Sequence, residues 1–212
     1  MHRNRRCIEI ASIHLFLSFN LFYMKINSRL IIFTIILVAL QTACKLLFAP
    51  KLEWSGFSPF IAIALFSGFI MKERNMSFLL PLLALFISDA IIHVLYINNQ
   101  FDFAGLYAGQ WKNYLLLLAV TLIGWVFKGR SYPSLLAGVI AGPTLYFFVS
   151  NFLVWQATTE AVYAKSFSGL MTCYEAALPF YRNSLISTLL FLPVILLLYN
   201  YLIRKKAVLT LA

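Results

Sequence analysis

The residues best suited to chemistry are an aspartate and a histidine inside one long apolar segment. Asp89 follows Ser88, and His93 lies four residues later, so a helix would place both side chains on one face. A carboxylate inside an apolar segment is costly, because it must be paired, hydrated or protonated. We therefore interpret Asp89 as a contact to a substrate or a cation, and a structural hydrogen bond between helices is the alternative.

A second set of polar residues lies toward the end of the chain. Asn151 and Trp155 are also four residues apart, and Arg182 and Asn183 are adjacent. Arginine can neutralise a carboxylate or hold an anionic ligand with its planar set of donors. Asparagine and tryptophan also have structural interpretations, as a contact between helices and as an interfacial anchor. We predict that six residues bind a substrate: Asp89, His93, Asn151, Trp155, Arg182 and Asn183.

The composition places these polar residues in a membrane. Of the 212 residues, 62% are hydrophobic and only 11% are charged. Soluble domains are about 45–50% apolar and about 25% charged. The excess of apolar side chains therefore favours lipid as the solvent of this chain. The net charge of +10 does not indicate a nucleic-acid partner, because the Lys and Arg residues stand between apolar runs.

The apolar segments predict an all-α, polytopic membrane helical bundle. A spanning helix needs about 20 mostly apolar residues, and the second and fourth segments fall short of that length. Before the last segment, residues 162–179 carry apolar side chains at helical spacing and predict an amphipathic surface helix. That helix would be either a lid over a site or an inert connector. The six predicted transmembrane helices are residues 30–48, 57–71, 76–97, 113–127, 134–156 and 184–203.

The basic residues predict the orientation of the bundle. Cytoplasmic loops carry an excess of Lys and Arg. If the segment before the first span is cytoplasmic, the inner segments from residue 25 onward hold nine basic residues and the outer segments hold five. We therefore predict a multi-pass protein of the bacterial cytoplasmic membrane with both termini in the cytoplasm. The six predicted substrate-binding residues then lie in the outer half.

The start of the chain differs from the rest. A basic beginning precedes an apolar run up to residue 23, without a small-residue cleavage site, and Met24 opens a sequence typical of a bacterial start. We predict that residues 1–23 are an N-terminal extension, with an over-extended start as the favoured interpretation and a marginal seventh membrane segment as the alternative. Residues 24–206 then form the membrane domain, and residues 207–212 form a cytoplasmic tail.

Motifs of known enzymes are absent from the sequence. It contains no G-x-S-x-G, no H-E-x-x-H and no Walker motif. The three cysteines, Cys7, Cys44 and Cys173, lie far apart and form no metal-binding pattern. We therefore expect no enzymatic activity, no catalytic residue, no metal and no cofactor, and any energy for transport would come from a partner or a gradient.

Four separated stretches carry a resemblance to a known family. They are residues 56–68 (GFSPFIAIALFSG), 80–89 (LPLLALFISD), 147–155 (FFVSNFLVW) and 173–184 (CYEAALPFYRNS). In this order they resemble an uncharacterised bacterial family of membrane transport proteins, over about residues 30–203. The chain departs from that family's pattern at Gly56, where the family has asparagine, which would alter specificity if that asparagine contacts the ligand.

That family is in turn similar to the substrate-binding S components of energy-coupling-factor (ECF) transporters. The resemblance implies a six-helix protein that binds a vitamin-like molecule near the outer face and docks on a transmembrane coupling protein driven by two ATPases. It also implies that the small pair Ala39 and Ala43 in the first span contacts the coupling protein. Two rival hypotheses remain: a structural or assembly subunit without a ligand, and an integral membrane enzyme that uses Asp89 and His93 as acid and base.

Overall fold

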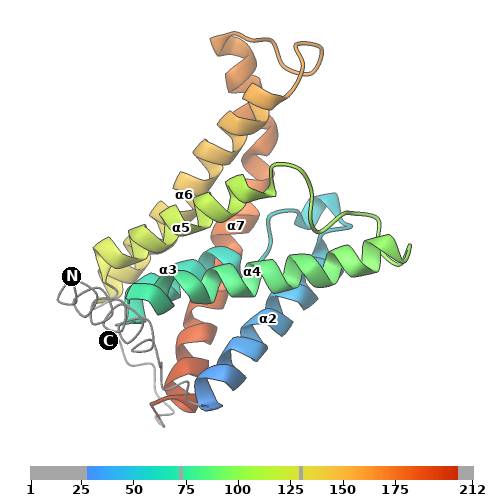
Figure 1. The fold of residues 1–212 in the computed structure, drawn as a ribbon. Helices are drawn as coiled ribbons and strands as arrows, with labels where there is room; N and C mark the ends of the chain where they lie inside the picture. Colours follow the sequence, from blue (N-terminus) through green and yellow to red (C-terminus); the bar gives the residue numbers. More distant parts are fainter. Residues whose placement is uncertain (1–27, 72–73, 129–130, 205–212) are drawn as a thin grey trace, which may run out of the picture.

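The computed structural model describes residues 28–204 apart from 72–73 and 129–130. The predictions for residues 1–23 and for the tail at 207–212 therefore lie outside the described residues. Within the described ranges the fold is all-α, as predicted from the sequence, with six α-helices and one short 3-10 helix (Figure 1). In chain order these are α2 (Ser28–Phe48), η1 (Leu52–Trp54), α3 (Phe60–Ile70), α4 (Arg74–Ile97), α5 (Gln110–Phe127), α6 (Tyr132–Ala157) and α7 (Phe167–Leu202).

Four helices, α2, α4, α6 and α7, are long and apolar enough to cross a membrane. Their outer faces carry large apolar side chains, such as Ile35 on α2 and Leu189 on α7, which are 60% and 57% exposed. Continuous apolar surface of this kind is rare on water-soluble proteins. The exposed faces therefore suit contact with lipid, which supports the prediction of a membrane protein.

Helix α3 is the centre of the bundle. It has only 11 residues, so it rises about 16 Å, against a hydrocarbon core of about 30 Å. Each residue from Ile61 to Ile70 is buried, and the helix packs against α4, α5 and α7. A helix that is apolar on every side must be enclosed by other helices. The second predicted span, residues 57–71, thus contains a short buried helix that alone cannot cross the membrane.

Two glycines allow α3 and α5 to approach closely. A Cβ atom on Gly68 would lie 2.2 Å from the carbonyl oxygen of Thr121 and 2.8 Å from the Cα of Gly124. A Cβ atom on Gly124 would lie 2.7 Å from the carbonyl oxygen of Leu65. The two backbones are therefore in direct contact, which is how small residues let helices pack in a membrane.

Helix α7 differs from the sequence prediction. Residues 162–179 were expected to form a separate surface helix, but the part from Phe167 onward belongs to one 36-residue helix that continues through Pro179 and Pro193. Such a helix rises about 54 Å, well beyond the hydrocarbon thickness. Its first turns pair with the end of α6 in a hairpin that extends past the other helices (Figure 1). The prediction of a separate helix was wrong, because proline is tolerated inside the helices of membrane proteins.

We predict that Gly68→Ala destabilises the fold by about 1–3 kcal/mol, because the added methyl group meets backbone atoms that cannot move aside. Unfolding in mixed detergent micelles at increasing denaturing detergent measures the difference. Gly142→Ala is the matched control, because its methyl group would meet only the side-chain tips of Leu65, at 3.1 Å or more. Equal stability of the two variants would contradict the close contact between α3 and α5.

Candidate binding site

A cavity of about 290 Å³ lies where the end of α2, the second half of α4 and the start of α5 come together. The segment before α3, the middle of α6 and the loop of residues 98–109 complete its walls. Most of the lining is apolar, and its charged and amide side chains come from α2, α4 and α5. A mostly apolar cavity with a few convergent polar groups is typical of small-molecule sites.

The polar centre of the cavity is an ion pair between helices α2 and α4. The Lys45 ammonium group donates a hydrogen bond to Asp89 Oδ1. The Asp89 side chain is only 3% exposed and the Lys45 side chain is 20% exposed. Two side chains of α5 donate to the other carboxylate oxygen, Gln110 Nε2 at 2.7 Å and Tyr114 Oη at 2.9 Å. The carboxylate is therefore charge-paired and accepts hydrogen bonds at both oxygens.

The hydrogen-bond network continues from α5 to α6 and to the loop. Asn113 Nδ2 donates to Gln110 Oε1 at 3.0 Å and to the Tyr107 hydroxyl at 2.7 Å. The Tyr146 hydroxyl of α6 donates to Asn113 Oδ1 at 3.2 Å. Burial raises the pKa of the Tyr107 phenol, so the group stays protonated at neutral pH. The network therefore connects the ion pair with four helices and the loop.

The wall formed by α2 carries a polar group without a partner. Gln41 lies one helical turn before Lys45 and is completely buried. Its Oε1 accepts a hydrogen bond from Ser58 Oγ at 3.1 Å, whereas its Nε2 has no hydrogen-bond partner within the described part of the chain. Gln41 lines the cavity. A buried donor without a partner is expensive, so this atom suits a group that enters the cavity.

The loop of residues 98–109 closes one side of the cavity. A Cβ atom on Gly105 would lie 2.0 Å from the carbonyl oxygen of Asp89 and 2.6 Å from the amide nitrogen of His93, so only glycine fits there. The Leu106 amide donates weakly to His93 Nδ1 at 3.5 Å. Phe101 and Phe103 of the loop reach the cavity. His93 thus lies against the loop and does not line the cavity.

The six predicted substrate-binding residues are not gathered at one place. Asp89 lines the main cavity. Asn151 lines a second cavity of about 210 Å³, which shares Gly56, Phe60 and Tyr146 with the first. The Asn151 side chain donates to the carbonyl oxygen of Phe147, one turn earlier on α6, at 2.8 Å. The two cavities are therefore neighbours, with Asp89 and Asn151 in different ones.

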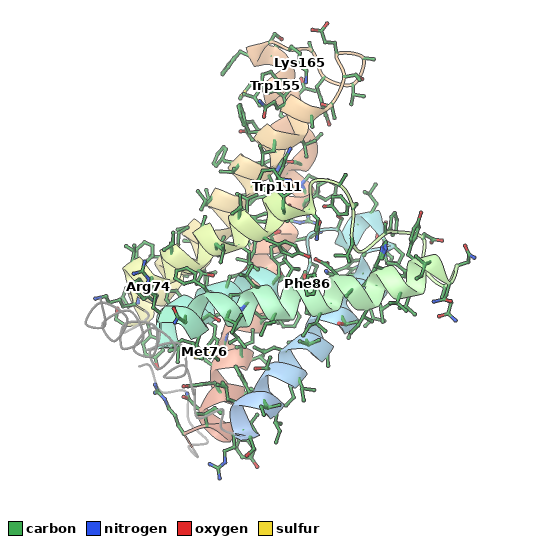
Figure 2. The ribbon with its side chains drawn as sticks, in the orientation of Figure 1. Arg74, Met76, Phe86, Trp111, Trp155 and Lys165 are labelled. Atoms are coloured by element: carbon green, nitrogen blue, oxygen red, sulfur yellow. The ribbon has the colours of Figure 1, made fainter. Side chains whose placement is uncertain are left out.

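Besides His93, three more of the predicted residues line neither cavity. Trp155 Nε1 donates to the carbonyl oxygen of Ala164 at 2.9 Å, and the Lys165 ammonium group lies 5.3 Å from the Trp155 ring. Both residues lie near the tip of the hairpin of α6 and α7, away from Trp111 at the start of α5 (Figure 2). Arg182 is exposed. Asn183 is buried and donates to the backbone carbonyl oxygens of Glu53 and Ser55.

Several cavity residues were missed by the sequence analysis. Lys45 entered the sequence analysis only as one of the five basic residues of the outer segments. It lies four residues after Gln41, which is the same spacing as that between Asp89 and His93. A glutamine in the middle of an apolar helix is as costly as other buried polar groups, so it was a usable signal. Gln110 and Asn113 lay at the boundary of a loop, where polar residues are ordinary.

The comparison with known proteins gives a family. A family model covers residues 24–210, which include every helix of the bundle and all the residues that line the cavity. The chain belongs to DUF6580. This is a family of unknown function. No curated protein and no solved structure matches the chain.

We predict that Lys45→Met and Asp89→Asn each destabilise this DUF6580 protein by about 3–5 kcal/mol, because each leaves a buried charge without its partner. The double variant should lose much less than the sum of the two single losses, because it removes both charges. A double-mutant cycle on unfolding in mixed micelles measures the coupling. Additive losses would mean that Lys45 and Asp89 do not form a pair in the folded protein.

Proposed function

We propose that this protein is the substrate-binding subunit of a membrane transport system and captures a small organic molecule in the cavity around Asp89. The observation that carries the proposal is a cavity of about 290 Å³ next to an ion pair whose carboxylate is buried and hydrogen-bonded at both oxygens. Ionisable residues within membrane bundles are expensive and mark substrate pathways more often than scaffolds. A pair needed only for stability would be served as well by apolar side chains.

The proposed topology has six passes, of which α3 makes the second as a short, enclosed helix. Non-helical backbone is tolerated at membrane depth only where protein surrounds it. Asn183 Nδ2 of α7 donates to the carbonyl oxygens of Glu53 and Ser55 at 2.7 and 2.9 Å, and Ser184 Oγ donates to that of Gly56 at 3.1 Å. These three bonds support an irregular segment that brings the chain from η1 down to α3.

In the proposed orientation the cavity lies in the outer half of the membrane, and the distribution of Lys and Arg supports this orientation. In the proposed topology α2 ends and α5 begins on the outer side, and the cavity lies between those two ends. An opening toward the outside suits capture of a solute from the medium. The hairpin of α6 and α7 would project from the membrane on the same side.

The proposal includes a partner protein, because the sequence has no motif for ATP hydrolysis. Ala39 and Ala43 are exposed on α2 and lie one turn apart. Small residues on an exposed helix face allow another helix to approach closely. This placement supports the prediction, drawn from the resemblance to ECF S components, that α2 docks on a transmembrane coupling protein.

The first experiment is native mass spectrometry of the purified protein, together with thermal shift against a panel of vitamins and related metabolites. We expect a co-purifying small molecule that stabilises the protein. Ala49→Trp should abolish that binding, because Ala49 lines the cavity and the indole would fill it. Ala157→Trp is the matched control, because Ala157 is exposed at the end of α6 and lines neither cavity. Repeated preparations that carry no molecule, with a flat thermal panel, would favour a structural subunit instead.

The second experiment tests the partner. Affinity purification from membranes in mild detergent should recover a transmembrane coupling protein and paired ATPases. Ala39→Leu should weaken that recovery about tenfold or more, because the larger side chain prevents close helix approach. Ala157→Leu serves as the control for added bulk on an exposed surface. Equal recovery with both variants would remove the face of Ala39 and Ala43 from the proposed interface.

A further inference from the structure

We propose that the cavity selects an uncharged molecule that presents hydrogen-bond acceptors, such as a carbonyl oxygen and an aromatic nitrogen, to Gln41 and Lys45. This inference rests on the proposed function, because it names the chemical class that the same cavity takes. It follows from four features of the site: the occupied state of the Asp89 carboxylate, the unused donors on α2, the charge balance, and the apolar remainder of the lining.

The Asp89 carboxylate has little capacity left for a ligand. Its Oδ1 accepts from Lys45, and its Oδ2 accepts from both Gln110 and Tyr114. Three of its about four acceptor positions are therefore used, so an amine could add only one hydrogen bond without displacing a donor. Asp89 therefore acts as a positioning residue, which holds the Lys45 ammonium group at the edge of the cavity.

Two side chains of α2 bring unused hydrogen-bond donors to the cavity. Gln41 Nε2 carries two hydrogens and has no partner within the described residues. The Lys45 ammonium group carries three hydrogens, and among the described residues Asp89 is the one acceptor that it reaches. The two residues are one turn apart on α2, so their side chains are neighbours. A ligand that satisfies both must offer acceptors a few ångströms apart on one edge.

The start of α3 adds to this preference. Ser58 and Phe60 line the cavity, and Phe60 is the first residue of α3. The amino-terminal end of a helix carries a partial positive charge. Ligand atoms with partial negative charge are therefore favoured on that side of the cavity as well.

The charge balance excludes ions. Lys45 and Asp89 neutralise each other, and the cavity lies inside a bundle with apolar surroundings. A carboxylate ligand would bring one uncompensated negative charge and an ammonium ligand one uncompensated positive charge. Burial of an uncompensated charge costs far more than burial of a hydrogen-bonded neutral group. An uncharged acceptor can use the same donors without that cost.

The apolar walls of the cavity indicate the size and the character of the rest of the ligand. Leu85 and Ile92 of α4 and Phe101 and Phe103 of the loop offer apolar and aromatic surface. If each atom takes about the 30 Å³ of a water molecule, the volume of about 290 Å³ holds on the order of ten non-hydrogen atoms. A single substituted aromatic or heteroaromatic ring has this size.

Three pyridines of nearly equal size test the class: meta-acetylpyridine, pyridine-3-carboxylate and meta-aminomethylpyridine. At neutral pH they are uncharged, anionic and cationic, respectively. Saturation-transfer NMR on the protein in micelles, with empty micelles as the control for partition, ranks their affinities. We expect meta-acetylpyridine to bind at least tenfold more tightly than either ion.

Two glutamine variants test whether the ligand binds at the side of the cavity that Gln41 and Lys45 form. Gln41→Leu should weaken meta-acetylpyridine binding by about fivefold to tenfold, the effect of one lost hydrogen bond. Gln156→Leu should leave it unchanged, because Gln156 is exposed and lines neither cavity. If Gln41→Leu does not fold, the ranking of the three pyridines on the unaltered protein still tests the class.

The outcomes separate this inference from the proposed function. Tightest binding of the aminomethyl compound would show that Asp89 is released to the ligand, and would overturn the inference. Tightest binding of the carboxylate, unchanged affinity in Gln41→Leu, or no binding of any of the three would overturn it as well. In each of these cases a co-purifying molecule in native mass spectrometry would leave the proposed function standing, and its absence would remove both.

Discussion

The arrangement of this bundle depends on the buried ion pair between Lys45 and Asp89. Neither charge is stable alone in an apolar bundle, so α2 and α4 must meet where the two side chains meet. The carboxylate also needs donors for its second oxygen, and Gln110 and Tyr114 supply them, which fixes the start of α5. The end of α2, the second half of α4 and the start of α5 are thereby held around one point. The cavity is the space that remains beside that point.

The short length of α3 makes the room for this cavity. A full-length helix at the centre of the bundle would fill the space between α2, α4, α5 and α6. Here α3 begins only at Phe60, and the irregular segment before it is held to one side by Asn183 and Ser184. Gly56 in that segment has φ +86°, and a Cβ atom would lie 2.6 Å from the carbonyl oxygen of Phe180. Gly56 therefore keeps the segment close against α7.

The sequence predicted the helices well and the site only in part. Apolar length depends on each segment alone, so the bounds of α2, α4 and α6 agree with the prediction to within two residues. The cost of a buried carboxylate is also a local property, and Asp89 proved to line the cavity. Its partners Lys45 and Gln110 lie 44 and 21 residues away along the chain, and only packing brings them together. The continuity of α7 through Pro179 likewise depends on the helices around it.

Within the proposed function, helix α2 connects the cavity with the partner surface. Gln41 and Lys45 line the cavity, whereas Ala39 and Ala43 are exposed on the outside of the bundle. A bound molecule that hydrogen-bonds to Gln41 would add a second anchor to α2, one helical turn from the Lys45–Asp89 pair. The proposed partner would contact the same helix from the other side. Ligand occupancy and docking would then be coupled through the position of α2, without a longer pathway through the bundle.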